Sequence, residues 1–231
     1  MGFVTKLQEM EVKGKILKNA DVSYLDKVFL KDGLVEPFPS STLDHVPPEH
    51  IMLWCAKNAV YQLPTIELID WLREHCGIEK GFRAIEICAG KSGIGRALGI
   101  PSTDSYAQVA DPFIQVYYQM LGQPIVEPPD YVEKIDANEA VKKYKPNVVI
   151  GSWVTQRWLS EEDKDGNMYG PLEEEWVDAG TMYVHIGNKA VHGTKRILDR
   201  PWNGYHYPWL RSRAHDPRQN YIWQWNCFPG L

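Results

Sequence analysis

The chain has 231 residues, of which 44% are hydrophobic and 24% are charged, a composition typical of folded globular proteins. Its formal net charge of −5 argues against a general attraction to nucleic acid, so sequence-specific DNA binding is not expected. No run of about 18 apolar residues occurs and the charged start lacks the apolar core of a secretion signal, which predicts a cytoplasmic protein with no membrane partner. The four cysteines form no Cys-x-x-Cys pair, so we expect free thiols and no metal site.

The beginning of the chain is expected to be an irregular N-terminal segment, residues 1–47, ahead of a single domain over residues 48–231. The segment shows no clean hydrophobic period, and Pro37, Pro39 and Pro47 interrupt it.

Two helices are predicted at the start of the domain. The first opens at Pro48, because proline is tolerated in the first turn of a helix. The second follows Thr65, whose hydroxyl can cap a helix N-terminus, and ends at Gly77, a residue type that often closes helices.

Beyond residue 80, short apolar runs alternate with helical stretches. Strands are predicted at residues 82–88, 100–106, 131–135, 147–153, 181–187 and 221–226, with helices ending near residue 99 and spanning residues 112–120 and 137–144. This alternation predicts an α/β protein with a mainly parallel sheet, helices on both faces and an antiparallel C-terminal strand. Parallel sheets bind ligands beyond the carboxyl ends of their strands, so the polar residues at those ends form the candidate site.

A glycine-rich turn follows the first of these strands and allows three interpretations. A P-loop would need a glycine at the position of Ile85, so its phosphate cradle cannot form. A dinucleotide fingerprint would need the spacing G-x-G-x-x-G, whereas Gly90, Gly93 and Gly95 have the reverse spacing. The third interpretation is the first motif of Rossmann-type methyltransferases, in which an acidic residue in an apolar strand is followed by small residues.

The methyltransferase interpretation makes Glu86 the acidic residue and places Cys88, Gly90 and Ser92 at the small-residue positions, with Gly93 beside them. Small side chains let the backbone pass close to a ligand. A glycine-rich turn that binds nothing is the alternative interpretation.

Three further strand ends carry residues in the order that this interpretation requires. Asp104 can accept from both ribose hydroxyls of a nucleoside, and Asp136, followed by Ala137, can accept from an adenine amino group. Ser152 and Trp153 follow the fourth strand, where the substrate would lie. Because a strand-end aspartate is also a common helix cap, the ordered set rather than any one residue indicates a cofactor site.

The sequence also resembles a known family in four stretches, residues 61–72, 85–90, 99–106 and 148–154. They resemble a group of bacterial and phage proteins with the class I S-adenosylmethionine-dependent methyltransferase fold, over roughly residues 48–226. The resemblance implies a Rossmann-like methyltransferase fold and S-adenosylmethionine as the cofactor. It implies no particular acceptor, because that group has none assigned.

The end of the fourth strand bears on the acceptor. Residues 151–156 lack the Asp/Asn-Pro-Pro-aromatic motif of exocyclic-amine DNA methyltransferases and the Pro-Cys pair of enzymes that attack pyrimidine rings. Methylation of a DNA base therefore loses its usual signatures. His185 on the fifth strand and His192 after it are the candidate general bases, although a histidine in a strand is more often a core residue.

A basic and aromatic segment occupies residues 189–218. It carries seven Lys or Arg against two Asp or Glu, interleaved with Trp202, Tyr205, Tyr207 and Trp209. Such a segment can contact a nucleotide or a phosphate, or it can be an aromatic flap packed on the sheet, and both interpretations stay open.

Together these features predict an S-adenosylmethionine-dependent methyltransferase that acts on a small molecule or a nucleotide. Methyl transfer depends on proximity and orientation and needs a general base only when the nucleophile is protonated. The alternative is a catalytically silent binding or accessory protein that keeps the fold, and a nicotinamide-dependent oxidoreductase is a third hypothesis. Trp223 and Trp225 in the last strand fit either a core or an interface, so the sequence leaves the oligomeric state open.

Overall fold

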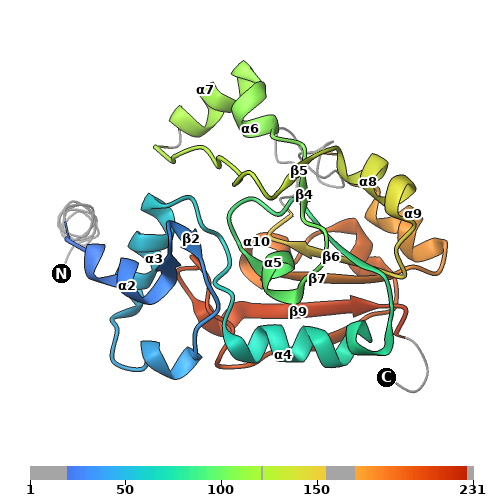
Figure 1. Cartoon of the computed structure of the whole chain (residues 1–231), viewed down its shortest axis with the longest axis horizontal. Helices are drawn as coiled ribbons and strands as arrows, with labels where there is room; N and C mark the ends of the chain where they lie inside the picture. Colours follow the sequence, from blue (N-terminus) through green and yellow to red (C-terminus); the bar gives the residue numbers. More distant parts are fainter. Residues whose placement is uncertain (1–19, 121, 155–169, 228–231) are drawn as a thin grey trace, which may run out of the picture.

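The computed structural model describes residues 20–120, 122–154 and 170–227, which form a mixed α/β fold (Figure 1). Its main sheet has five strands in the order β3-β6-β7-β9-β8. Their bounds are Ala84–Ile87 for β3, Val148–Ser152 for β6, Met182–Asn188 for β7, Asn220–Trp225 for β9 and Asn203–Tyr205 for β8. β3, β6 and β7 are buried along their whole length, which explains why the sequence shows them as apolar runs.

The make-up of the main sheet differs from the prediction. β3 pairs parallel with β6 and β6 pairs parallel with β7, but β9 is antiparallel to both of its neighbours, β7 and β8. The expectation of a mainly parallel sheet is therefore wrong: the sheet is mixed, and β9 is the expected antiparallel strand near the C-terminus. The difference arises because β4 and β5 pair outside this sheet, whereas β8, which the sequence does not predict, joins it antiparallel to β9.

The second and third predicted strands are only two residues long. β4 (Thr103–Asp104) and β5 (Glu133–Lys134) pair in parallel as a separate sheet. A single parallel bridge between Glu86 and Ser102 joins the start of β4 to β3. β4 ends early because Tyr106 takes the left-handed conformation, with φ of 60°, and turns the chain into the next helix.

Helices cover both faces of the main sheet, as predicted (Figure 1). α4 (Ile66–His75) packs on one face, and α8 (Ala137–Tyr144) and α9 (Glu173–Asp178) pack on the other. Successive residues of β6 alternate between these two hydrophobic clusters, with Ile150 on the α4 side and Val149 on the opposite side.

The tryptophans of the last strand belong to the core. Trp223 and Trp225 are 3% and 1% exposed and lie in the cluster under α8 and α9. Of the two interpretations that the sequence left open, the structure therefore supports core packing.

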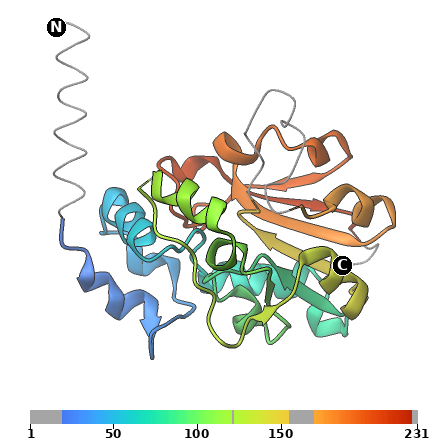
Figure 2. The same cartoon turned by 90° about the horizontal axis from the view of Figure 1, so that it is seen from above.

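Residues 20–47 hold more regular structure than the sequence predicts. Besides two 3₁₀ turns, they contain a short helix, α2 (Asp26–Phe29), and two short strands, β1 (Leu30–Lys31) and β2 (Leu34–Val35). These pack in one hydrophobic cluster with α3 (Pro48–Lys57), and the Trp54 indole N–H donates to Asp26 Oδ1 at 2.7 Å. Figure 2 shows this blue part beside α3 at one end of the molecule. Residues 1–19 of the predicted N-terminal segment lie outside the described residues.

The remaining helices are short. α4 begins after Thr65 as predicted, and the Thr65 hydroxyl accepts from the Leu68 amide at 3.3 Å.

In the described ranges, no helix combines the length and the apolar character that crossing a bilayer requires. The other helices and 3₁₀ turns are α5 (Ile94–Leu98), α6 (Ala107–Ala110), α7 (Pro112–Met120), α10 (Lys189–His192), η1 (Ser23–Leu25), η2 (Ser40–Leu43), η3 (Ile78–Lys80), η5 (Arg196–Asp199) and η6 (Pro217–Gln219).

Candidate functional site

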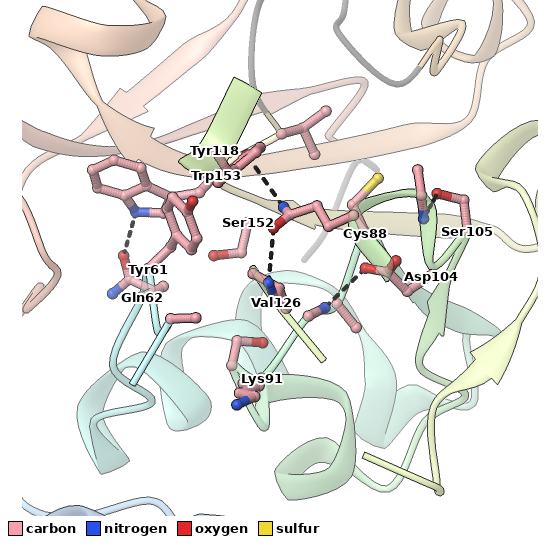
Figure 3. Close-up of a pocket in the computed structure, with 17 residues that line it drawn as sticks. Tyr61, Gln62, Cys88, Lys91, Asp104, Ser105, Tyr118, Val126, Ser152 and Trp153 are labelled. Carbon is pink, nitrogen blue, oxygen red and sulfur yellow. Dashed lines mark hydrogen bonds between the residues drawn. The ribbon is translucent and has the colours of Figure 1, made fainter. Parts of the chain in front are cut away.

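A cavity opens at the carboxyl ends of β3, β4 and β6, between the sheet and the helices α6 and α7 (Figure 3). Its empty space measures about 610 Å³, including the part that opens to solvent. β3 lies where the sheet divides, because β4 follows it on one side and β6 on the other. Ligands of open α/β sheets bind at such a point.

Glu86 fastens the glycine-rich turn rather than lining the cavity. It is 1% exposed, and its carboxylate accepts from Ser92 Oγ at 2.6 Å, the Gly95 amide at 2.8 Å and Ser102 Oγ at 2.9 Å. Burial raises the pKa of Glu86, although these three donors act in the opposite direction. The predicted cofactor residue is therefore an internal anchor that joins the turn to the start of β4.

The glycines of the turn serve close packing. A Cβ on Gly95 would lie 2.2 Å from Ser102 Oγ and 2.7 Å from a carboxylate oxygen of Glu86. Gly93 has φ of 72°, and a Cβ there would lie 2.7 Å from the Val35 carbonyl oxygen. These contacts give a physical reason for a glycine spacing that fits neither phosphate-binding motif.

The small residues of the predicted motif do line the cavity. Cys88, Gly90 and Ser92 all contribute to its wall. Cys88 has a left-handed backbone, with φ of 49°, and burial raises the pKa of its thiol. Ala59 and Trp153, also in the wall, have φ of 54° and 55°. Left-handed non-glycine residues cost about 1–3 kcal/mol each and cluster at functional sites, so their position here supports a functional cavity.

Asp104, at the end of β4, is the carboxylate that the described residues place in the cavity wall. Its two oxygens accept from the Gly90 amide at 3.1 Å and the Tyr106 amide at 2.8 Å, and burial raises its pKa. Each carboxylate oxygen has two acceptor positions, so one on each stays available for a ligand hydroxyl. Asp104 is thus fixed by backbone donors, one of them from the glycine-rich turn after β3.

Asp136 and Ala137 do not line the cavity. Asp136 caps α8, where its Oδ1 accepts from the Asn138 amide at 2.8 Å and the Glu139 amide at 3.4 Å. Ala137 is 5% exposed and belongs to the core. The structure therefore brings Asp104, but not Asp136, to the candidate site.

Ser152 and Trp153 lie in the cavity wall at the end of β6, as the sequence predicts. Ser152 Oγ is buried and has no hydrogen-bond partner within the part of the chain that the structure describes. The Trp153 indole N–H donates to Gln62 Oε1 at 3.3 Å.

Several cavity residues were not predicted from the sequence, because they come from segments distant from the glycine-rich turn. They are Tyr61, Gln62, Ser105, Gln108, Tyr118 and Val126. Tyr61, Gln62 and Ser105 lie in the stretches that resemble the methyltransferase family, and this is the signal that could have found them.

No protein-family model matches this chain, and no curated protein matches it either. Among the described residues, no group of three or more His, Cys, Asp or Glu side chains is placed to hold a metal ion.

The two predicted base candidates lie behind the cavity wall. His185 and His192 are 1% and 0% exposed, their ring centroids are 4.8 Å apart, and neither lines the cavity. Trp153, which lines the cavity, contacts His192 with ring centroids 5.3 Å apart. Burial lowers the pKa of His185 well below its usual value and that of His192 to about 3, so both imidazoles are neutral. Their Nε2 atoms have no hydrogen-bond partner in the described ranges.

A buried ion pair supports the same wall from behind. Lys195 and Glu173 are 3% and 1% exposed in their side chains and lie 2.9 Å apart. Lys195 Nζ also donates to the carbonyl of Val154, a cavity residue, at 3.0 Å. Tyr183 donates its hydroxyl proton to Glu173. The pair thus holds the end of β6 in place.

The aromatic residues of the basic segment mostly pack on the sheet. Tyr205, Tyr207 and Trp209 are partly buried against the α4-side core. Tyr207 and Trp209 stack with centroids 4.5 Å apart. One arginine of the segment, Arg213, reaches the cavity region, with its guanidinium 4.3 Å from the Tyr61 ring centroid.

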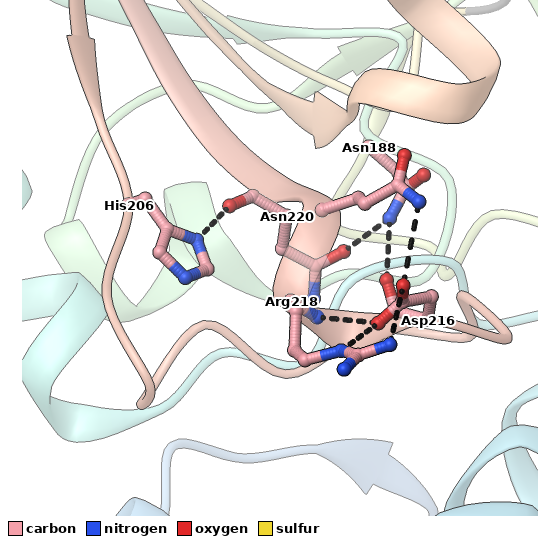
Figure 4. A network of polar contacts seen from close by, with 6 residues as sticks. Asn188, His206, Asp216, Arg218 and Asn220 are labelled. Carbon is pink, nitrogen blue, oxygen red and sulfur yellow. Dashed lines mark hydrogen bonds and ion pairs between the residues drawn. The ribbon is translucent and has the colours of Figure 1, made fainter.

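Polar contacts fix the far part of this segment to the ends of β7 and β9 (Figure 4). Asn188 Nδ2 donates to Asn220 Oδ1 at 2.9 Å and to the Asp216 carbonyl at 3.1 Å. Arg218 pairs with Asp216 at 2.9 Å, and His206 Nδ1 contacts the Asn220 carbonyl at 2.8 Å. These contacts favour the packed flap over an open ligand surface.

Proposed function

We propose that this chain is an S-adenosylmethionine-dependent methyltransferase acting on a small molecule or a nucleotide. The observation that carries the proposal is the cavity itself, because it gathers the ends of β3, β4 and β6 around the fixed carboxylate of Asp104. Three strand ends that the sequence motif assigns to a nucleoside cofactor and its substrate therefore meet at one point.

The strand order supports a Rossmann-like fold for this proposal. With β4 joined to β3 by the Glu86–Ser102 bridge and β5 beside β4, the parallel strands run β5-β4-β3-β6-β7. In order of appearance after residue 80, these are strands 3-2-1-4-5, the arrangement of doubly wound sheets that bind nucleotides at the 1–4 junction. The antiparallel β9 lies beside β7, with β8 at the edge of the sheet.

The residues present fit the cofactor. Asp104 keeps one acceptor position on each oxygen for the two ribose hydroxyls. Gly90 and Cys88 let the turn approach a ligand closely, and Ala107 and Val126 offer apolar surface for a base beside Asp104. When bound, S-adenosylmethionine supplies an electrophilic methyl group on a positively charged sulfur. The chain's own part is to hold and orient the two reactants and to exclude water.

Calorimetry with S-adenosylhomocysteine tests the proposal. We expect a micromolar dissociation constant for the natural chain and loss of detectable binding in Asp104→Ala. Asp136→Ala is the matched control, because Asp136 is also a strand-end aspartate but caps α8 away from the cavity. It should bind as the natural chain does. Absence of binding by the natural chain would contradict the proposal.

A catalytically silent binding protein is the second candidate. One observation favours it: the predicted bases His185 and His192 lie outside the cavity wall. Incubation of a cell extract with methyl-labelled cofactor separates the two. Label transfer that depends on the chain supports an enzyme, and cofactor binding without transfer supports the silent protein.

A further inference from the structure

The two ends of the cavity differ in chemistry. Figure 3 shows Cys88, Asp104 and Ser105 at one end and Tyr61 with Trp153 at the other, with Tyr118 above them. The first end carries the carboxylate suited to a ribose. The second end is walled by aromatic rings that come from three separate parts of the chain.

Trp153 is held in one orientation by several independent contacts. Its backbone amide donates to the Ile186 carbonyl at 2.8 Å while its φ of 55° lies in the left-handed region. Its indole N–H is engaged by Gln62, which is fully buried. Gln62 is itself fixed, because its amide donates to the Arg211 carbonyl at 2.7 Å. The indole N–H is therefore already used within the protein, and Trp153 contributes its ring system to the cavity wall.

Tyr61 completes a narrow aromatic wall. Its ring centroid lies 5.8 Å from that of Trp153 at an interplanar angle of 53°. The Arg213 guanidinium stacks on the Tyr61 ring, so this ring is also fixed. Burial raises the pKa of Tyr61, which keeps its hydroxyl protonated at neutral pH and removes it as a general base.

The same end holds no base among the described residues. Figure 3 shows Asp104, the carboxylate of the wall, at the opposite end, and neither His185 nor His192 lines the cavity. A nucleophile that is already unprotonated at neutral pH suits such a wall, because it needs no general base. A pyridine-like ring nitrogen meets this condition, and its flat ring stacks well on tryptophan and tyrosine.

We propose that the aromatic end of the cavity is the acceptor subsite and that the acceptor is a flat nitrogen heterocycle, methylated on a ring nitrogen. The inference rests on the proposed function. The lone pair of the ring nitrogen forms the new N–C bond, and the C–S bond breaks with its electron pair staying on sulfur, which becomes a neutral thioether. The heterocycle takes up the positive charge, or releases a ring N–H proton to water where it has one.

Quinoline is a suitable probe, because it is flat and its ring nitrogen is unprotonated at neutral pH. It is titrated into the chain saturated with S-adenosylhomocysteine, beside cyclohexanecarboxamide as a neutral probe that is not flat. We expect quinoline to bind and cyclohexanecarboxamide not to bind. With methyl-labelled S-adenosylmethionine, mass spectrometry should detect N-methylquinolinium.

Three variants locate the subsite. Trp153→Leu removes the stacking face and should weaken quinoline binding roughly 5- to 150-fold. Trp153→Phe keeps an aromatic face and should retain most of the affinity. Trp202→Leu is the matched control, because Trp202 is 45% exposed and does not line the cavity, and it should bind as the natural chain does.

Binding of S-adenosylhomocysteine is measured for every variant and shows that each one is folded. If Trp153→Leu loses it, Tyr61→Leu takes its place in the comparison. Failure of the natural chain to bind S-adenosylhomocysteine contradicts the proposed function. Normal S-adenosylhomocysteine binding with equal affinity for both probes, or with no effect of Trp153→Leu and Tyr61→Leu on quinoline, overturns the acceptor inference alone.

Discussion

The buried pair of Lys195 and Glu173 makes a sharp prediction about stability. Both side chains are almost fully buried, and Lys195 also holds the Val154 carbonyl at the cavity wall. Lys195→Met removes the positive charge that lies 2.9 Å from the buried Glu173 carboxylate. Removing one partner of a buried pair costs about 3–5 kcal/mol, so we expect a loss of this size in the free energy of unfolding. Glu173→Gln should also destabilise the chain, because it leaves the Lys195 charge buried.

The double variant Lys195→Met/Glu173→Gln separates lost charge from lost packing. It leaves no unpaired charge and keeps an amide oxygen that can accept from Tyr183, so it should recover most of the stability lost by Lys195→Met. Urea unfolding provides the assay, and the exposed pair of Arg200 and Asp178 provides the control. Arg200→Met should leave the midpoint almost unchanged, because exposed pairs contribute little. A loss below about 1 kcal/mol for Lys195→Met would show that the pair is not dry and would refute the reasoning.

Two further predictions concern stability. Gly95→Ala should destabilise the chain by about 1–3 kcal/mol, because a Cβ would overlap Ser102 Oγ and the Glu86 carboxylate; an unchanged urea midpoint would contradict the packing described for α5. The second concerns pH: the pKa of His192 is about 3 in the folded chain and near 6.5 when unfolded, so below pH 6.5 the unfolded chain binds a proton that the folded chain does not. Stability is therefore lost as the pH falls through this window, whereas the raised pKa values of Glu86 and Asp104 act in the opposite direction above about pH 4. The pH dependence of the free energy of unfolding, compared between the natural chain and His192→Gln, isolates the contribution of His192. Between pH 6.5 and 5.5, His192→Gln should lose about 1 kcal/mol less of this free energy than the natural chain, and an equal loss in both would refute the assignment.

The strands and helices near the cavity were predictable because their patterns are local. The buried run of β6 and the Thr65 cap of α4 are encoded in a few neighbouring residues. The antiparallel last strand, β9, was expected, but β8 was not, because its three residues Asn203–Tyr205 show no strand pattern of their own. The short length of β4 depends on the left-handed turn at Tyr106, which no residue type in that stretch announces.

The candidate site was predictable in part. Asp104 and Asp136 look alike in the sequence, since each ends a strand ahead of a helix. They differ in the structure because Asp104 faces the Gly90 loop of the adjacent strand, whereas Asp136 lies one strand farther out and caps its own helix. His185 was a base candidate by type, but β7 is a central strand that is covered on both faces, so its histidine is buried. The aromatic wall joins Tyr61 and Trp153 across the fold, which no local pattern reveals.

A crystal structure of the chain grown with S-adenosylhomocysteine tests the central claim most directly. The account predicts density for the ligand in the cavity at the ends of β3, β4 and β6, with both ribose hydroxyls within hydrogen-bond distance of Asp104 and the sulfur pointing toward Ser152 and Trp153. Density for the ligand at another place, or an empty cavity at a ligand concentration that saturates binding in solution, would contradict it.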